Sequence, residues 1–533
     1  MANTYNTPGV YVEEISKFPP SVAGVATAIP AFIGYTEKAD DMNVPVRITS
    51  LLGYEAIFGK GPELSVNADK SIKNIQYVLY DSMRLFYDNG GGICYVVSVG
   101  QYDKKQPEKS EVECFKEGIA VLEKVDEVTL LLFPDAVNIE GDENGALLGS
   151  VQNAALKHCQ KMGDRFAILD VKKISPENDI KLFRNNISSN AEELRYGAAY
   201  YPYLSTIYTK SWSFKDVKIY LNNFEEALKL MEGKPKENLE ILLSDIESIK
   251  SGDFFEQYLT DDDKKIIDGI TLTELEEKDA TDEEKAELTA KKKEAKKKEL
   301  LDEKKAEKKA ELKAGNKLRI NSIIPFIPGY NEALKELNAI VTSIPPSGAM
   351  AGIYSSTDQY KGVWKAPANV SIASLSGVSD FITSQGQENM NVDSNAGKSV
   401  NAIRVFAGKG IIVWGARTLD GNSNEWRYIS VRRLFNYIEE SVQKSTSWAV
   451  FSSNDGNTWI KIKSQIENFL NNLWRSGALA GSTPESSYFV NVGLGITMTD
   501  DDIKNGLLII DIGLAAVRPA EFIVLRFSHK VQE

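Results

Sequence analysis

The chain has 533 residues, more than one hydrophobic core usually supports, so we expect several domains or one domain with large insertions. Hydrophobic residues make up 42% and charged residues 26%, a balance that excludes a largely disordered chain. The net charge of −13 argues against a nucleic-acid or anionic-membrane partner, because both attract basic surfaces.

Cysteine usage and apolar runs indicate a cytosolic product. Cys94, Cys114 and Cys159 show no CxxC spacing and are predicted to be buried, reduced thiols. The N-terminus has no basic start followed by an apolar run, so no secretory signal is expected. The longest apolar stretch, Leu507 to Val517, is too short for a membrane helix and carries Asp511, which favours a core strand. We therefore expect no direct membrane insertion.

Residues 10–15 have the composition of a strand but no partner strand follows them. Pro19 and Pro20 interrupt the chain directly afterwards. The backbone groups of such a strand need hydrogen-bond partners elsewhere, and the edge of a sheet in another chain can supply them.

The next hundred residues predict a helix packed against a sheet. Val22 to Thr36 is rich in small and β-branched residues and predicts a buried strand. Apolar residues spaced three and four apart from Ile72 to Phe86 predict one helix, which Asn89 ends. Ile93 to Val99 predicts another buried strand. A phosphate site at Gly90 to Gly92 is disfavoured, because a strand follows the glycines where such a site needs a helix.

A second α/β block follows. Val128–Ala136, Arg165–Val171 and Tyr196–Leu204 predict buried strands, and Ser150–Met162 predicts a helix between the first two. This order favours a parallel crossover.

The two histidines give little support to catalysis. His158 lies in the predicted helix and His529 near the C-terminus, and neither is close to a GxSxG nucleophile motif. We interpret His158 as an ordinary helix residue.

A highly charged segment interrupts the globular pattern. Thr281 and Glu284 form a capping box and Gly315 is a stop signal, which predicts one long helix between them. Its leucines are too sparse for a coiled-coil seam, so we interpret it as a solvated spacer or surface spike. RNA binding at Lys291–Lys293 is the weaker alternative, because glutamates cancel the charge and no aromatic residue lies nearby.

The last part of the chain returns to a compact pattern. Residues 402–419 predict strands with glycine turns, and residues 427–445 and 457–481 predict amphipathic helices. Thr499 with Asp500 to Asp502 predicts a polar helix start and not a metal site, because successive aspartates cannot all face one ion. Behind Pro519, the segment from Phe522 to Phe527 predicts a second detached strand.

Several motifs in a fixed order resemble the sheath proteins of contractile phage tails and phage-like injection particles. They are "TPGVYVEEI", "PPSVAGVATAIPAFIGYT", "GGG-ICYVVSV", "GVWKAPAN", "VWGARTL", "YISVRRLFNYIEESV" and "RPAEFIVLRF". The likeness covers about residues 1–100 and 344–533. More weakly, "LLLFPDA" to "RFAILD" resembles the family's subtilisin-like domain without its catalytic residues. The lysine- and glutamate-rich helix departs from the family pattern.

The resemblance implies a mixed α/β subunit of several domains. The implied parts are an N-terminal linker arm (1–20), a first core part (21–105), a subtilisin-like middle domain (106–220), an exposed charged helical insertion (221–340), a C-terminal core domain (341–518) and a C-terminal β-arm (519–533). Subunits of the family form six-membered rings that stack helically around an inner tube, and their terminal arms complete a small sheet in neighbouring subunits.

The same resemblance assigns roles to residues at both ends. The N-terminal arm would consist of Val10, Tyr11, Val12, Glu13, Glu14 and Ile15. The C-terminal arm would consist of Phe522, Ile523, Val524, Leu525, Arg526 and Phe527. Hinges are expected at Pro19, Pro20 and Pro519, within the connectors Ser16–Pro20 and Gly513–Pro519. Independently of the resemblance, candidates for contact with the inner tube are Arg432, Arg433 and Arg475 on the predicted C-terminal helices, with a solvated helix face as the alternative.

The expected partners are other copies of this chain, an inner tube protein, and baseplate and tail-terminator or cap proteins. No nucleic acid, cofactor, metal or catalytic residue is expected, and assembly would take place in the bacterial cytoplasm. Two alternatives remain open: a non-contractile shell or surface-layer polymer, and a subtilisin-like hydrolase with a nucleophile beside His158.

Overall fold

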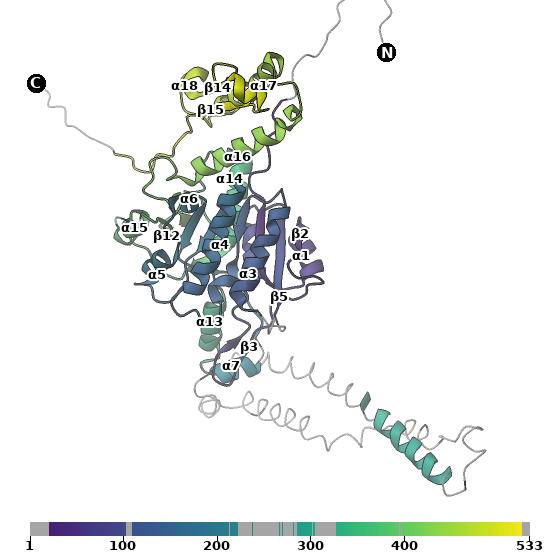
Figure 1. The fold of residues 1–533 in the computed structure, drawn as a ribbon. Helices are drawn as coiled ribbons and strands as arrows, with labels where there is room; N and C mark the ends of the chain where they lie inside the picture. Colours follow the sequence, from purple (N-terminus) through teal and green to yellow (C-terminus); the bar gives the residue numbers. More distant parts are fainter. Residues whose placement is uncertain are drawn as a thin grey trace, which may run out of the picture. The chain divides into compact units, whose positions relative to one another are not determined.

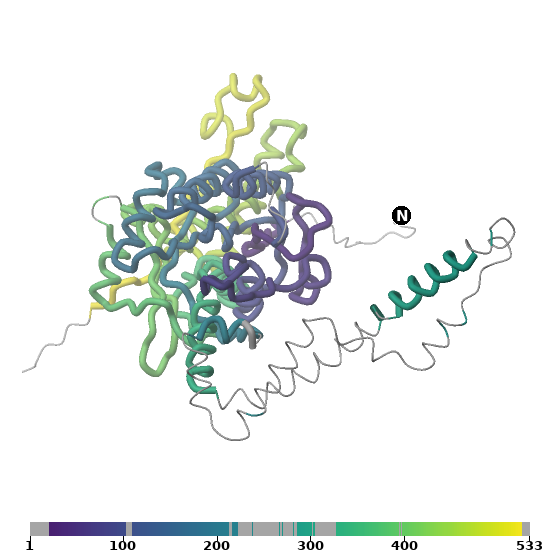
Figure 2. The backbone as a smooth tube through the Cα atoms, turned by 90° about the horizontal axis from the view of Figure 1, so that it is seen from below, coloured from purple at the N-terminus to yellow at the C-terminus, as the bar shows by residue number. Residues whose placement is uncertain are grey.

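The computed structural model describes residues 21–102, 109–212, 214–221, 285–300, 302–303, 327–393, 395 and 397–524, with the isolated positions 237, 266, 269 and 281. The described residues separate into two compact units. One draws on residues 1–63, 74–209 and 341–533, and the other on residues 64–73 and 210–340. The first unit is thus discontinuous in sequence, and Figure 2 shows its early blue segments beside green segments of the later chain.

An eight-stranded sheet lies at the centre of the first unit, in the order β13-β12-β8-β7-β6-β1-β5-β2 (Figure 1). Its strands are β1 (Pro30–Thr36), β2 (Pro45–Ile48), β5 (Cys94–Gln101), β6 (Leu130–Leu132), β7 (Phe166–Asp170), β8 (Gly197–Tyr201), β12 (Val400–Phe406) and β13 (Gly410–Val413). The inner strands run parallel, and β2 and β13 pair antiparallel at the edges. The strands predicted within residues 22–36, 93–99, 128–136, 165–171 and 196–204 are confirmed.

Helices cover both faces of this sheet, which explains why its inner strands are apolar on both sides. Helices α3 (Glu111–Ala120) and α4 (Ala146–Met162) share one core with Ile33 and Val97. Helices α2 (Leu79–Asp88) and α14 (Ser347–Lys361) share the other core with Phe32 and Val96. Alternate residues of β1 and β5 therefore enter opposite cores, as the two-residue period of a strand requires.

Helix α2 is shorter than the sequence predicted. Its first residue is Leu79, while Ile72 lies in the short strand β4 (Ile72–Lys73) and Asn74 has a left-handed φ of 65°. The buried Asp135 carboxylate accepts hydrogen bonds from the backbone N–H groups of Val78 and Leu79 at 2.6 and 2.8 Å. This distant carboxylate satisfies the first N–H groups of the helix, and no local sequence pattern signals it.

The predicted boundary between residues 21–105 and 106–220 falls inside the sheet. Strand β1 pairs with β5 on one side and with β6 on the other, and β12 of the C-terminal part pairs with β8. The structure therefore corrects the division: these parts share one sheet and the same two cores.

The end of the chain forms a third core. Helix α16 (Ile429–Ser445), helix α17 (Gly456–Arg475) and the two-stranded sheet of β14 (Tyr488–Val492) and β15 (Ile510–Leu514) contribute to it. The apolar faces predicted for both helices are confirmed by the burial of Leu434, Ile438, Ile462 and Ile466. The strand expected in residues 507–517 is confirmed as β15.

The first half of the predicted connector Gly513–Pro519 is wrong. Gly513 and Leu514 belong to β15, and the N–H of Val517 donates to the carbonyl oxygen of Ala478 at 3.2 Å. The Phe489 ring covers Gly513 from the neighbouring strand and would clash with a Cβ there. Only the residues after Val517 can act as a connector.

Smaller elements complete the first unit. The helices are α1 (Leu51–Phe58), α5 (Asp179–Asn186), α6 (Ala191–Leu194), α15 (Ser384–Asn391), α18 (Pro484–Ser487) and α19 (Asp500–Lys504), with 3-10 turns at Val121–Lys124, Pro134–Asn138 and Ser447–Ala449. Strands β9 (Leu204–Thr206), β10 (Ser343–Ile344) and β11 (Leu375–Val378) form a separate sheet. None of the described helices is long and apolar enough to cross a membrane.

The second unit contains strands β3 (Ser65–Val66) and β4 and helices α7 (Phe214–Tyr220) and α13 (Tyr330–Val341). Its small core includes Val66, Val217 and Leu337. Residues 285–300 are helical, which confirms part of the long helix predicted from Thr281 to Gly315. The rest of that predicted helix, apart from residues 302–303, lies outside the described residues.

Candidate assembly site

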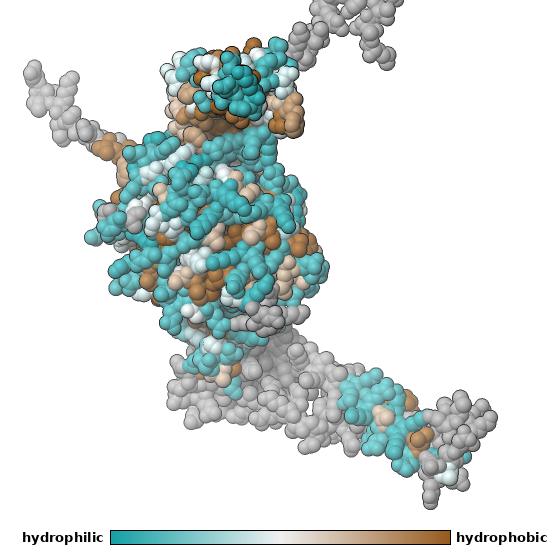
Figure 3. All heavy atoms as spheres, in the orientation of Figure 1, coloured by the Kyte–Doolittle hydropathy of each residue, from teal (hydrophilic) through white to brown (hydrophobic). Residues whose placement is uncertain are grey.

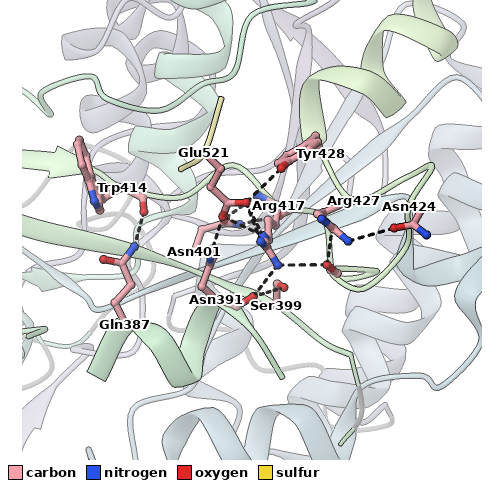
Figure 4. Close-up of polar contacts among 11 residues, drawn as sticks. Gln387, Asn391, Ser399, Asn401, Trp414, Arg417, Asn424, Arg427, Tyr428 and Glu521 are labelled. Atoms are coloured by element: carbon pink, nitrogen blue, oxygen red, sulfur yellow. Dashed lines mark hydrogen bonds and ion pairs between the residues drawn. The ribbon is translucent and has the colours of Figure 1, made fainter. Parts of the chain in front are cut away.

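Glu521 is held firmly where the chain leaves the folded body (Figure 4). Arg417 donates from Nε to Oε1 at 2.9 Å and from Nη2 to Oε2 at 2.6 Å. The Asn391 amide donates to Oε1 at 2.6 Å, and the Tyr428 hydroxyl donates to Oε2 at 3.1 Å. The paired bonds from Arg417 match the two carboxylate oxygens, an arrangement that adds geometric specificity as well as energy. We call these four residues the Glu521 clasp.

The partners of Glu521 are themselves fixed by the fold. Asn401 on β12 accepts from the N–H of Arg417 at 2.8 Å and donates to its carbonyl oxygen at 2.8 Å. Asn391 is the last residue of α15, and its carbonyl oxygen accepts from Ser399 at 2.6 Å. Tyr428 directly precedes α16. Three separate elements thus present preformed donors to one carboxylate.

The electrostatics of the clasp favour the ionised carboxylate. Burial alone would raise the pKa of Glu521, but hydrogen bonds and charge from Arg417, with help from Asn391, lower the pKa below its ordinary value. Burial and the neighbouring Glu521 carboxylate raise the pKa of Tyr428, so its hydroxyl stays a donor. The Arg417 side chain is only 5% exposed and that of Glu521 21%, so solvent screens the pair weakly.

Directly after Glu521 the chain becomes exposed and apolar. Phe522, Ile523 and Val524 are 72%, 79% and 76% exposed and have no secondary structure. Figure 3 shows apolar side chains where the described chain ends. Leu525, Arg526 and Phe527 lie outside the described residues.

The β14–β15 sheet has open edges. Among the described residues, each of the two strands has the other as its only strand partner. Val490 and Val492 point into the core, while Phe489 is 53% exposed on the other face. An isolated two-stranded sheet gains stability from further strands, and its unpaired backbone groups form a template for them.

The N-terminal residues predicted to form an arm lie outside the described residues. These are Val10, Tyr11, Val12, Glu13, Glu14 and Ile15, with the hinge residues Pro19 and Pro20. The third predicted hinge residue, Pro519, lies two positions before Glu521, at the point where the clasp fixes the chain.

Two of the three arginines proposed for a tube contact are buried. Arg433 donates to both oxygens of Asp358, at 3.0 and 2.6 Å, and to the carbonyl oxygen of Thr27 at 2.8 Å. Arg432 lies over the Trp426 ring at 4.2 Å and pairs with Glu439. The structure thus gives both guanidinium groups internal roles, and only Arg475 is exposed. A tube contact at Arg475 stays a prediction.

His158 occupies a structural position. Its Nε2 lies 2.9 Å from Nη1 of the fully buried Arg165, which also donates to the carbonyl oxygens of Leu122 and Val125. Burial, with the nearby Arg165 charge, lowers the pKa of His158 to about 4, so the ring is neutral and Nε2 accepts. This geometry gives no support to the hydrolase alternative.

Other candidate groups have ordinary partners. Cys94, Cys114 and Cys159 are buried and form no disulfide. Thr499 caps α19 through a capping box with Asp502, as the predicted polar helix start requires. Within the described part of the chain, no cluster of histidine, cysteine or carboxylate side chains could hold a metal ion.

Sequence reasoning missed the clasp, although three of its four residues lie in stretches that carried the family resemblance. Arg417 lies in "VWGARTL", Tyr428 opens "YISVRRLFNYIEESV", and Glu521 lies in "RPAEFIVLRF". No pattern in these motifs singles out the clasp residues, because each motif holds other polar residues as well. Only the fold shows that these motifs meet at one point.

Comparisons with known proteins agree with the resemblance to tail sheath proteins. Residues 422–530 match the family model of the phage tail sheath C-terminal domain. The tail sheath protein of Vibrio phage KVP40 is 27% identical over 136 residues, and that of Enterobacteria phage T4 is 23% identical over 158 residues. The alignments cover 26% and 29% of this chain but only 20% and 23% of the two relatives. The chain therefore spans less than a quarter of each curated relative.

Solved structures match nearly the whole chain. The sheath complex of the PVC extracellular contractile injection system, in its contracted state, is 25% identical with a TM-score of 0.57 and covers 99% of both chains. The helical sheath of the anti-feeding prophage, also contracted, is 26% identical with a TM-score of 0.57, and the alignment covers 99% of this chain and 100% of that one.

Proposed function

This chain is a member of the tail sheath family, and from that premise we propose that it is the structural subunit of a contractile sheath. Subunits polymerise as stacked hexameric rings around an inner tube, and contraction of the polymer drives the tube through a target envelope. Baseplate and terminator proteins bind at the ends of the polymer. The particle assembles in the bacterial cytoplasm and acts as a phage tail or a phage-tail-like device.

One observation carries the proposal: an apolar tail leaves the folded body directly after a residue that is held in place. The clasp holds Glu521, and the next three residues are exposed and strand-forming. The same body carries the β14–β15 sheet with open edges. A strand added to such an edge gains backbone hydrogen bonds, and its alternate side chains set the register.

Exchange of these tails between copies explains a helical polymer. The donor strand and the acceptor sheet are different surfaces, so the contact is head-to-tail and propagates without closing on a pair. The N-terminal residues 10–15 provide the second donated strand. Together the two arms keep each subunit linked while the bodies move.

Repacking of the bodies supplies the energy of contraction. If each subunit buries ~200 Å² more apolar surface in the contracted lattice, the gain is on the order of 5 kcal/mol per subunit. Summed along a tube, this energy drives penetration without nucleotide hydrolysis. The extended polymer is then a metastable store of that energy.

Deletion of the tail beyond the clasp tests the proposal. A chain lacking residues 522–533 keeps all four clasp residues, including Glu521, so we expect a folded, soluble subunit that forms no tubes by electron microscopy. A chain lacking only residues 528–533 keeps the strand residues and is the matched control, which should assemble. Normal tubes from the longer deletion would contradict exchange of the C-terminal strand.

A further inference from the structure

The last turn of α15 ends at the clasp residue Asn391, and the carbonyl oxygens of its last three residues accept no hydrogen bond from within the helix. Arg184, near the end of α5, supplies two of the missing donor contacts. Its Nη2 donates to the carbonyl oxygens of Asn389 and Met390 at 2.8 and 3.0 Å. The carbonyl oxygen of Asn391 accepts from the Ser399 hydroxyl at 2.6 Å (Figure 4). A guanidinium group at this end of a helix is also favoured by the helix dipole.

A reciprocal set of hydrogen bonds joins α5 to the residue that precedes Ser399. Nε of Arg184 donates to the carbonyl oxygen of Lys398 at 2.8 Å. Nζ of Lys398 donates in return to the carbonyl oxygens of Arg184 and Ile187, at 2.7 and 2.8 Å. Lys398 is 4% exposed and the Arg184 side chain 15%, so water competes little for these bonds. Helix α5 thus fixes both the end of α15 and the segment that holds Asn391 from the other side.

The end of α5 is itself held by α4 and by the turn before it. Asn186, the last residue of α5, donates from its side-chain amide to the carbonyl oxygen of Asn144 at 2.8 Å. The backbone carbonyl oxygen of Asn186 accepts from the Asn153 amide at 3.0 Å. Gly149 of α4 lies so close to Asn186 that a Cβ there would clash with it. Arg184 is therefore presented from a well-anchored helix.

We infer that Arg184 is a positioning residue of the clasp: it fixes the last turn of α15 and thereby places the Asn391 amide at Glu521. Arg184 acts through the α15 carbonyl oxygens and through Lys398, and not on Glu521 itself. Bonds from a charged donor are the stronger kind, and a polar site keeps its geometry only when the residues around it are themselves fixed. The hold on the C-terminal tail therefore depends on how α5 packs against α4. This inference concerns contacts within one chain and stands whether or not tails are exchanged between copies.

Hydrogen exchange of the Val517 amide, measured on the soluble full-length subunit, reports the hold of the clasp on the tail. This amide donates to the Ala478 carbonyl oxygen just before the tail. R184Q should accelerate its exchange roughly ten-fold, because the lost hydrogen bonds come from a charged donor. K181Q removes a charge from an exposed position of the same helix and is the matched control, which should leave the rate unchanged. Unchanged exchange in R184Q would overturn the inference.

A double-mutant cycle separates positioning of the clasp from a general loss of stability. E521A removes the carboxylate that Asn391 binds, so R184Q should cause no further acceleration at Val517 in the E521A chain. Equal acceleration by R184Q with and without Glu521 would show that Arg184 does not act through the clasp, and would overturn the inference.

The conservative variant R184K guards the cycle against misfolding of R184Q. The Phe166 amide donates to the Thr129 carbonyl oxygen at 2.9 Å in the central sheet, and its protection reports whether the body stays folded. Lysine keeps the charge but lacks the planar fork of arginine, so R184K should accelerate exchange at Val517 less than R184Q does. Its effect should also vanish in the E521A chain. If R184Q loses protection at Phe166, the cycle is measured with R184K, and an effect that persists in E521A would overturn the inference.

Discussion

At the residue scale, partly or fully buried carboxyl groups hold distant segments of the chain together. Glu521 ties the C-terminal tail to Arg417, Asn391 and Tyr428. Asp170 accepts from the N–H of Ser347 at 2.8 Å, at the start of α14. Hydrogen bonds to an ionised group such as Glu521 are stronger than neutral ones, and both carboxyl groups hold segments that are distant in sequence.

The variant E521Q should release the tail without unfolding the body. Loss of the charge weakens the clasp by about 1.5–3 kcal/mol, and hydrogen exchange of the Val517 amide, which donates to the Ala478 carbonyl oxygen just before the tail, should become faster. E485Q, at an exposed acid in the same part of the chain, is the control. Unchanged exchange in E521Q would show that the clasp does not hold the tail.

Acid should release the tail in the same way. The pKa of Glu521 is lowered in the folded protein, so its ionised form stabilises the docked tail above the ordinary glutamate pKa of about 4.3. That stabilisation is lost as the pH falls through the lowered pKa. Hydrogen exchange, corrected for its intrinsic pH dependence, should show this release in the natural chain and little of it in E521Q. A Val517 amide that stays equally protected at low pH would contradict this assignment.

The stability of the body should fall as the pH rises from 5 to 8. Burial raises the pKa of Asp170 to about 7, although hydrogen bonds from Ser347 oppose the rise. A carboxyl group with a raised pKa in the folded protein contributes its full stabilisation below the ordinary aspartate pKa. This stabilisation is lost as the pH rises through 7. D170N keeps an acceptor for the Ser347 N–H but cannot ionise. The free energy of unfolding, measured in urea at each pH, should therefore fall less steeply with pH in this variant, by up to about 1.4 kcal/mol per pH unit. An identical slope would contradict the titration of Asp170.

At the element scale, α16 connects parts of the first unit. Arg433 on α16 pairs with Asp358 on α14 and reaches Thr27 of the N-terminal segment. Both side chains of the pair are nearly buried, at 3% and 6% exposed. Removal of one member of such a pair leaves the other charge buried without its partner.

R433L should therefore destabilise the protein by about 3–5 kcal/mol in denaturant unfolding. The exposed Arg475 provides the comparison, and R475A should change the stability by less than about 0.5 kcal/mol. The double variant R433L/D358L should recover part of the loss, because no unpaired charge remains. Equal stability of R433L and R475A would contradict a structural role for Arg433.

Elements with strong local patterns were predictable, and those fixed by distant partners were not. The strand at Ile93–Val99 and the apolar faces of α16 and α17 follow from periodicity alone. The start of α2 at Leu79 depends on Asp135, and Gly513 pairs with Phe489 of the neighbouring strand, whose ring leaves no room for a Cβ. The clasp joins Arg417 and Glu521 across 104 positions of sequence, so only the fold reveals it.

At the scale of the whole molecule, the proposed strand exchange would complete each subunit with segments of its neighbours. An apolar tail is presented at one place and an open sheet edge at another. Exposed edges of this kind favour association, and the proposed exchange turns that tendency into a defined polymer.

Removal of residues 1–18 should leave a soluble subunit that forms no ordered tubes. The deleted segment contains the proposed N-terminal strand, whereas the described cores lie entirely in later residues. Sedimentation and electron microscopy measure the outcome. Ordered tubes formed by the shortened chain would contradict a role for the N-terminal arm in exchange.

The polymer should exist in two lattices. A contractile sheath predicts a narrow, long form and a wide, short form that arises from it, whereas a shell or surface-layer polymer predicts one form. Imaging of the polymer before and after triggering measures both diameters and pitches. A single lattice under all conditions would favour the static alternative.

The most direct test of the account is a cryo-electron microscopy map of the assembled polymer at a resolution that traces strands. We predict that the β14–β15 sheet gains residues 10–15 and residues 522–527 as added strands, each from a neighbouring chain. A map in which both segments fold back on their own subunit would contradict strand exchange and the mechanism built on it.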